Sequence, residues 1–190
     1  IYWNAIDYKK DFYERHDIYD RYNAYYGLGG AWYYSLSSTL MTPTNLKNVI
    51  FGGKVQTIPN YICAYLQEIT EINIPDNVTS IGNYAFFQCT ALNSIIIGNN
   101  VNKIGEHAFN GCSKLTSITI PNSVTNIGSS AFSGCSSLTT ITSKSTTPPL
   151  LGTNAIPTTI GIIYVPRSSI EEYKIVWSDY ADKIIGYDFE

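Results

Sequence analysis

The sequence predicts a β-rich α/β solenoid of short parallel strands, preceded by an aromatic element and closed by a helical cap. Three observations support this fold class: a 23-residue repeat between Ile72 and Ile141, many tyrosines near the amino terminus, and an amphipathic pattern near the carboxyl terminus. We therefore divide the chain into a tyrosine-rich segment, a solenoid and a cap, which span residues 1–45, 46–166 and 167–190.

The repeat is strict, because each unit carries the same residue types at the same positions. A unit this short cannot bury its apolar side chains except against copies of itself, which is typical of a solenoid. A less regular copy from Leu46 to Ile69 keeps the register, so we expect the solenoid to begin near residue 46 and to contain about five coils. The strict series are Ile74, Ile97 and Ile120; Val78, Val101 and Val124; Gly82, Gly105 and Gly128; Phe86, Phe109 and Phe132; Cys89, Cys112 and Cys135; and Leu92, Leu115 and Leu138.

The first part of each unit alternates like a half-buried strand, with Ile95 and Ile97 directed inward and Ser94 and Ile96 outward. Neighbouring strands stack about 4.8 Å apart, so the outward residues of successive units form one nearly uncharged face. Curved solenoids use such a face to bind extended partners, although Thr and Ser also suit any exposed pleated surface. The candidate binding face comprises Thr70, Glu71, Asn73, Asn93, Ser94, Ile96, Thr116, Ser117, Thr119, Thr139, Thr140 and Thr142.

The second part of each unit predicts another extended piece, at Val101–Ile104, followed by a turn at Gly105. Glycine at this corner indicates either a positive φ or a close approach of two backbones. The third part, Ala108–Cys112, predicts a single helical turn that places Phe109 inside the coil. We therefore expect the equivalent phenylalanines of successive units to stack in an aromatic ladder.

The segment before the solenoid is rich in tyrosine, and residues 1–26 alone hold seven of the 16 tyrosines. From Asp7 the aromatic positions keep near-helical spacing, and Gly27 is placed to end such a helix. This element predicts either a cap over the first coil or a contact surface for a protein or carbohydrate. The candidate contact residues are Tyr19, Tyr22, Tyr25, Tyr26, Trp32 and Tyr33.

The last strand is predicted at Ile162–Val165, and a helix is predicted after it. Ser168 and Ser169 each precede a glutamate by three residues, which is the pattern of a capping box. The helix would present one broad apolar face, which we expect to cover the open sheet edge of the last coil. That face comprises Ile170, Tyr173, Val176, Trp177, Tyr180 and Ile184.

The unit I-x-I-P-x-x-V-T-x-I-G-x-x-A-F-x-x-C-x-x-L, almost complete at Ile118–Leu138, resembles the BspA-like branch of the leucine-rich repeats. The run Tyr164-Val165-Pro166 and the later Trp177 and Tyr180 are similar to a carboxyl-terminal cap that often follows these repeats in proteins of gut bacteria. The resemblance implies a right-handed, horseshoe-like solenoid on a cell surface or secreted, with a role in adhesion. It implies no catalytic residues, and related repeats also occur in phage and parasite surface proteins.

Composition argues against nucleic-acid partners, because the net charge is −3 and only 12 residues are Lys or Arg. We expect no membrane span, since no apolar run approaches the roughly 20 residues that a bilayer requires. The first residue is Ile1 rather than Met, so we expect a mature or trimmed product.

The residues capable of chemistry are sparse and scattered. Three of the four cysteines recur at the period of the repeat, a spacing that predicts a column of buried free thiols and not a zinc site. The two histidines, His16 and His107, have no evident partner, and we expect His107 to be solvent-exposed. We predict no catalytic residue, no metal and no cofactor.

These observations predict a non-enzymatic, extracellular or cell-surface module that binds a protein or glycan on a host or neighbouring cell. The alternative is a structural or receptor-binding part of an assembly such as a phage fibre or virion. In that case residues 1–45 would attach the chain to a particle or to sister chains, because aromatic residues concentrate at interfaces. A hydrolase built on the solenoid is the least favoured function.

Overall fold

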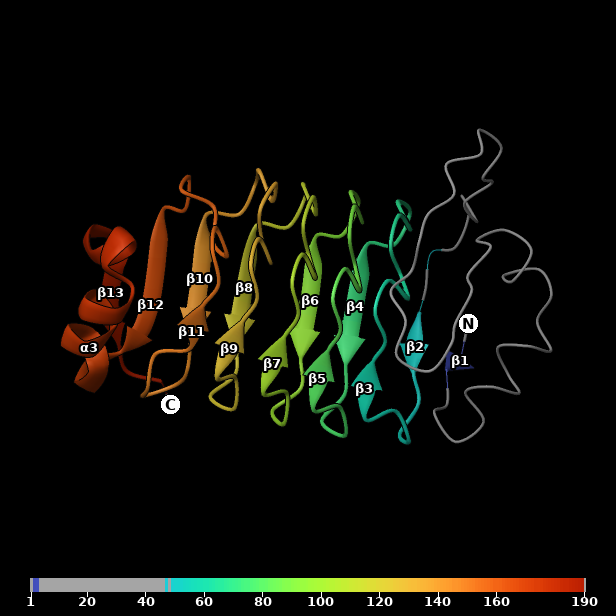
Figure 1. The fold of residues 1–190 in the computed structure, drawn as a ribbon, viewed down its shortest axis with the longest axis horizontal. Coiled ribbons are helices and arrows are strands. Elements are labelled where there is room, and N and C mark those ends of the chain that lie inside the picture. Colours follow the sequence, from blue (N-terminus) through green and yellow to red (C-terminus); the bar gives the residue numbers. More distant parts are fainter. Residues whose placement is uncertain (1, 4–46, 48, 190) are drawn as a thin grey trace.

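The computed structural model describes residues 2, 3, 47 and 49–189, in which the chain winds into coils stacked along one axis (Figure 1). Each coil holds a first strand, a second strand of two residues and a turn segment, and the first strand has four residues in every coil after the first. Five such coils are described; they begin at β2, β4, β6, β8 and β10. The predicted helix after Asp7 and the six candidate contact residues of the amino-terminal segment lie outside the described residues.

The first strands form the longer row, and all of their pairings are parallel. They make a two-stranded sheet β4–β6 and a four-stranded sheet in the order β13–β12–β10–β8, while β1 pairs with β2. The bounds are β1 Tyr2–Trp3, β2 Ile50–Phe51, β4 Glu71–Ile74, β6 Ser94–Ile97, β8 Ser117–Ile120, β10 Thr140–Ser143, β12 Ile162–Pro166 and β13 Ile184–Tyr187.

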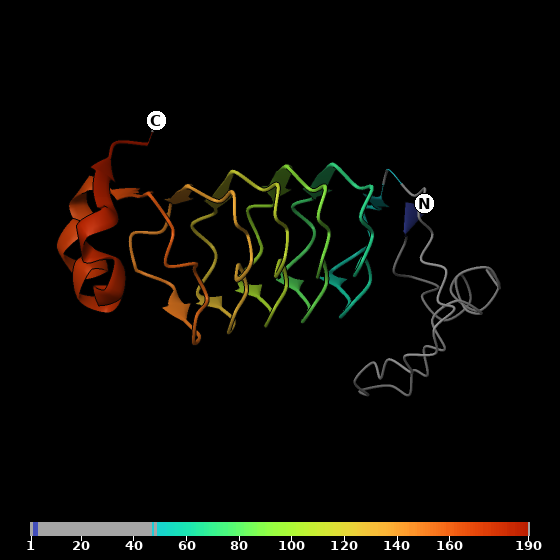
Figure 2. The ribbon, with the colours of Figure 1, turned by 90° about the horizontal axis from the view of Figure 1, so that it is seen from above.

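The second strands form a five-stranded parallel sheet on a different side of the stack (Figure 2). Their order is β11–β9–β7–β5–β3, and neighbours from β3 to β9 are offset by the length of one repeat. The bounds are β3 Thr57–Ile58, β5 Ser80–Ile81, β7 Lys103–Ile104, β9 Asn126–Ile127 and β11 Leu150–Leu151. The two rows confirm the predicted solenoid of short parallel strands.

The turn segments form the third side of each coil, and the prediction of a helical turn there is wrong. Residues 106–114 contain turns and no helix. The backbone N–H of Phe86 donates to the carbonyl of Ala108 at 2.8 Å, and that of Phe109 donates to the carbonyl of Ala131 at 2.9 Å. Backbone amides of this side therefore donate partly to the next coil, as in a sheet, and partly to carbonyls three residues earlier in the same turn, and they form no helix.

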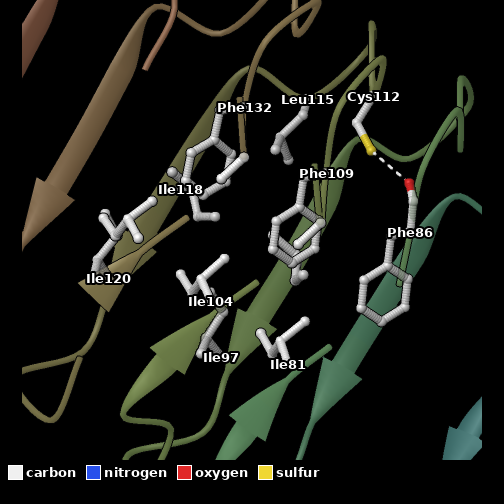
Figure 3. Close-up of a cluster of buried hydrophobic side chains, with 14 of the residues drawn as sticks. Ile81, Phe86, Ile97, Ile104, Phe109, Cys112, Leu115, Ile118, Ile120 and Phe132 are labelled. Atoms are coloured by element: carbon white, nitrogen blue, oxygen red, sulfur yellow. Dashed lines mark hydrogen bonds between the residues drawn. The ribbon is translucent and has the colours of Figure 1, made fainter. Parts of the chain in front are cut away.

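The predicted aromatic ladder forms the centre of the core (Figure 3). The ring centroids of Phe86 and Phe109 lie 5.2 Å apart and those of Phe109 and Phe132 lie 5.4 Å apart, with 4° between the ring planes in both pairs. All three side chains are fully buried. Their stacking along the solenoid axis links each coil to the next through the interior.

Gly105 lies where two successive coils come closest. A Cβ atom on this residue would lie 2.5 Å from the carbonyl carbon of Gly82, which is less than any tolerated contact. The described glycines with a positive φ are Gly111 and Gly134, so a close backbone approach, and not a left-handed conformation, requires glycine at this corner.

The carboxyl-terminal cap differs in part from the prediction. The helix α3, Ile170–Val176, is short, and the N-cap residue before it, Ser169, makes no side-chain capping bond, so the predicted capping box is wrong. Val176 is exposed and not part of the buried face. The chain continues through a 3₁₀ turn, Ser178–Lys183, into β13, so Ile184 lies in a strand and not in the helix.

Aromatic side chains of the cap nevertheless close the end of the solenoid, as predicted. The phenol of Tyr173 donates to the carbonyl of Ser145 at 2.9 Å, and the indole N–H of Trp177 donates to the carbonyl of Pro149 at 2.8 Å. Tyr180 donates to a further carbonyl of the fifth coil at 2.7 Å. These bonds satisfy carbonyl groups that no sixth coil covers.

Candidate functional site

The twelve residues of the predicted binding face lie within the long strands or directly before them. Ten are exposed, whereas Thr140 and Thr142 are half-buried. Pairing between strands places the outward residues side by side, and Glu71 is the one charged member of the set. We call this surface the long-strand face.

Apolar residues extend the long-strand face beyond the predicted set. Thr142 pairs with Tyr164 of β12, which pairs with Ile185 of β13. The rings of Tyr164 and Tyr187 lie 5.7 Å apart, and Tyr187 remains 52% exposed. The sequence did not indicate this extension, because Ile184–Tyr187 continues the apolar spacing of a helix and was not expected to form a strand.

A second surface feature lies on the turn side and was not predicted. The rings of Tyr61 and Tyr84 stack at 4.6 Å with 3° between their planes, and His107 stacks on Tyr84 at 4.6 Å and 14°. The ring of Phe87 meets those of Tyr65 and Tyr84 edge-on, at 5.2 and 5.5 Å. We call these five residues the aromatic turn cluster.

His107 is therefore half-buried against Tyr84, and the expectation of a solvent-exposed side chain is wrong. The amide nitrogen of Asn110 lies 3.3 Å from its Nδ1 atom. Burial is the main cause that raises the pKa of Tyr61, and the neighbouring Tyr84 adds to the effect. The signal for the cluster in the sequence is the recurrence of outward aromatic residues at the repeat period, at Tyr61, Tyr84 and His107. The prediction of the core used only the inward positions.

The backbone at these turns adopts an uncommon conformation. Tyr61, Tyr65 and Tyr84 have φ angles of 58°, 63° and 57°, in the left-handed region. This region costs a residue other than glycine about 1–2 kcal/mol, least for asparagine. Stacking between aromatic rings contributes about 0.5–1.5 kcal/mol and offsets part of that cost.

The comparisons with known proteins decide the family. The family model for the BspA type leucine rich repeat region matches residues 35–157 of this chain, in six copies. The chain belongs to this family. BspA-type repeats thus account for the solenoid and for most of the sequence, and the resemblance drawn from the motif is confirmed.

The solved structures similar to this BspA-type chain are bacterial leucine-rich-repeat proteins. A leucine-rich cell surface protein of Faecalibacterium prausnitzii is 28% identical, with a TM-score of 0.47 over 72% of this chain. A leucine-rich repeat protein of Bacteroides ovatus is 20% identical, with a TM-score of 0.40 over 78%. The chain spans 31% and 49% of their respective lengths.

A third similar structure is a leucine-rich repeat protein of T. pallidum, which is 19% identical, with a TM-score of 0.39 over 72% of this chain and 79% of its own. No curated protein matches the sequence.

The cysteines of the BspA-type repeats are structural. All four are unbridged and buried, which confirms the prediction made for Cys89, Cys112 and Cys135. The thiol of Cys112 donates to the carbonyl of Phe86 at 3.3 Å (Figure 3), and those of Cys89 and Cys135 make equivalent bonds to the preceding coil. Burial raises the pKa of the Cys89 thiol to about 12, so this sulfur remains protonated and unreactive near neutral pH.

The described part of the chain contains neither a metal-binding cluster nor a membrane-spanning helix. There, no group of three or more His, Cys, Asp or Glu side chains is arranged to hold a metal ion. Among the same residues, no helix has the length and apolar character needed to cross a membrane.

Proposed function

We propose that this chain is a non-enzymatic interaction module of a secreted or cell-surface protein. It binds a protein or glycan on a host or neighbouring cell through the long-strand face. The observation that supports this proposal most directly is the alignment of outward residues from successive strands on one exposed, nearly uncharged surface. Membership of the BspA-type family supports it further, because leucine-rich-repeat proteins are generally interaction modules without catalytic activity.

The rigidity of the backbone favours binding. The side chains of this face rise from paired strands above a fully packed core, so little conformational entropy is lost when a partner binds. The exposed side chain of Ile96, at 62%, and the apolar residues of β13 provide contact area beside the hydroxyl groups. A partner that combines apolar and hydrogen-bonding groups would match this composition.

The experiment compares two variants of the full chain that carry the same added charge. Thr119→Arg with Thr140→Arg places two cations on neighbouring coils of the long-strand face. Asn102→Arg with Thr125→Arg places them at equivalent, exposed positions of neighbouring coils outside that face. Binding of labelled protein to epithelial cells and to immobilised matrix proteins and mucin is measured, with circular dichroism as the folding control.

We expect at least tenfold weaker binding for the first variant and binding within about threefold of the wild type for the second. A tenfold loss corresponds to about 1.4 kcal/mol, which one obstructed contact region readily causes. Equal binding by all three proteins would place the site elsewhere. Equal loss in both variants would show that added positive charge, and not the long-strand face, determines binding.

A further inference from the structure

The aromatic turn cluster is not required by the fold. Its left-handed positions in the first three coils are occupied by Tyr61, Tyr84 and His107, whereas the equivalent position of the fourth coil is Ser130, with a φ of 54°. The fifth coil places Asn154 there, with a φ of 55°. Small polar residues therefore form the same turn, and asparagine does so at a lower backbone cost.

A second position of the first four turns is also left-handed, and its residue changes from bulky to small along the solenoid in the same way. It is Tyr65 in the first coil and Gln88 in the second, and glycine in the next two, Gly111 and Gly134. Bulky residues in sparsely populated backbone conformations cluster at ligand sites, where the side chain is retained despite its strain. Three tyrosines at such positions in two adjacent coils point to a role for their side chains.

No member of the cluster carries a carboxylate, ammonium or guanidinium group, and the rings are held in place by mutual stacking. Residues 83–91, which form the turn segment of the second coil, include no Asp, Glu, Lys or Arg, whereas Glu106 directly precedes His107 in the third coil. The amide of Gln88 packs over Gly111, where a Cβ atom would lie 2.4 Å from the amide nitrogen. Stacked rings thus lie beside amide, phenol and imidazole groups. Aromatic carbon next to uncharged donors and acceptors suits a ligand with C–H faces and hydroxyl groups, which is the chemistry of a neutral sugar.

The small exposed area of the cluster favours a narrow ligand. Each of the five side chains exposes about a third of its surface or less, so together they offer no more than roughly 350 Å². A stable protein interface needs about 800 Å² on each partner. A polysaccharide chain is narrow enough to be bound by the smaller area.

We propose that the aromatic turn cluster is a binding site for a neutral polysaccharide, separate from the long-strand face. The site spans the first three coils, and its five members are Tyr61, Tyr65, Tyr84, Phe87 and His107.

The test uses affinity electrophoresis of the full chain in gels that contain starch, β-glucan, galactomannan, arabinoxylan or the anionic polygalacturonate. Mobility is compared with that in a gel without polysaccharide. The test variant is Tyr84→Ser with Phe87→Ser, because the fourth coil carries serine at both equivalent positions, Ser130 and Ser133. Phe87→Ser alone serves if the double variant fails to fold. The control variant is Asn102→Arg with Thr125→Arg.

We expect at least one neutral polysaccharide to retard the wild type and the control variant. The double variant should bind that polysaccharide at least tenfold more weakly, and Phe87→Ser at least threefold more weakly. The proposal is overturned if no neutral polysaccharide retards the wild type, if polygalacturonate retards it equally well, or if the serine variants bind unchanged. It is also overturned if light scattering shows a dimer that the double variant dissociates, because the cluster would then be a self-association interface.

Discussion

The turn segments of the second and fourth coils share one backbone and differ on their surfaces. Tyr84 and Ser130 have φ angles of 57° and 54°, and Phe86 and Phe132 donate equivalent bonds to the next coil at 2.8 and 2.9 Å. The turn of the second coil carries an aromatic surface, whereas the turn of the fourth coil carries serine and glycine. The bonds between coils and the buried phenylalanines therefore maintain the fold, and the outward turn positions are free to differ.

The strongest test of this comparison replaces an inward and an outward aromatic residue. Phe109→Ala should lower the free energy of unfolding by about 3–5 kcal/mol, because it removes a fully buried ring from the middle of the ladder. Phe87→Ala, outside the core, should cost about 1 kcal/mol. Urea unfolding monitored by circular dichroism measures both. Equal losses would mean that the turn surface is as important to stability as the interior.

Replacement of two glycines with different structural roles should give smaller losses of stability. Gly105→Ala forces a Cβ atom against the backbone of Gly82 and should destabilise the chain by about 2–3 kcal/mol. Gly134→Ala introduces strain at a φ of 73° but meets its nearest atom at 3.2 Å, so about 1 kcal/mol is expected. The reverse order in thermal or urea unfolding would show that the sign of φ matters more than the approach of the coils.

Replacement of Tyr173 measures how much the hydrogen bonds at the capped end of the solenoid contribute to stability, for comparison with the phenylalanine ladder in its middle. This phenol is hydrogen-bonded to Ser145 and lies 2.7 Å from the hydroxyl oxygen of Ser143, so Tyr173→Phe should cost about 1–2 kcal/mol. A loss near zero would indicate that water replaces these bonds and that packing of the ring alone closes the last coil. Trp177→Phe, which leaves the carbonyl of Pro149 without its donor, provides a second measure of the same contact region.

Alkaline pH sharpens this test. Burial raises the pKa of Tyr173 to about 12, whereas an unfolded tyrosine ionises near pH 10. Between these values the unfolded chain loses the proton and the folded chain keeps it, so stability falls as the pH rises. The wild type should therefore lose more stability than Tyr173→Phe from pH 9 to pH 11, measured by urea midpoints. Parallel losses would assign the effect to other tyrosines, which both proteins retain.

The smallest expected effect is a gain. Ser130→Asn should stabilise the chain by about 0.5–1 kcal/mol, because asparagine tolerates the left-handed conformation that the fourth turn requires. Tyr84→Asn should change stability by less than about 0.5 kcal/mol, since relief of strain is offset by the lost stacking with Tyr61 and His107. Thermal unfolding compares the two, and a clear gain for Tyr84→Asn would show that stacking contributes little.

The sequence was informative about whatever faces inward. The period of the repeat was sufficient to assign the phenylalanine ladder, the cysteine column and the alternation of Ile95 and Ile97, because burial imposes the same residue type on every coil. The spacing Ala-Phe-x-x-Cys, however, fits a helical turn as well as paired turns. Side-chain spacing does not report the sign of φ, and so the structure of the turn segment was missed.

Other features were missed for different reasons. Ile184 follows Tyr180 at helical spacing, and the glycine in Ile184–Tyr187 weakens a strand pattern, so β13 was not recognised. The aromatic turn cluster depends on contacts between coils at positions that the repeat does not fix. The division into three segments and the contact role of the amino-terminal tyrosines stay predictions.

The fifth coil departs from the common spacing, and this limits where a further repeat unit could be accommodated. Coils that keep the common offset could accept an added unit, because each coil contacts only the coils beside it. The fifth coil lacks this freedom, since Asn126 pairs with Leu150 and Thr140 with Ile162, the first offset longer and the second shorter than the repeat. The carbonyl of Pro149 in this coil accepts a hydrogen bond from the indole N–H of Trp177 in the cap. An added 23-residue unit would therefore keep the existing contacts only before the fifth coil, and the cap requires the contacts of the fifth coil itself.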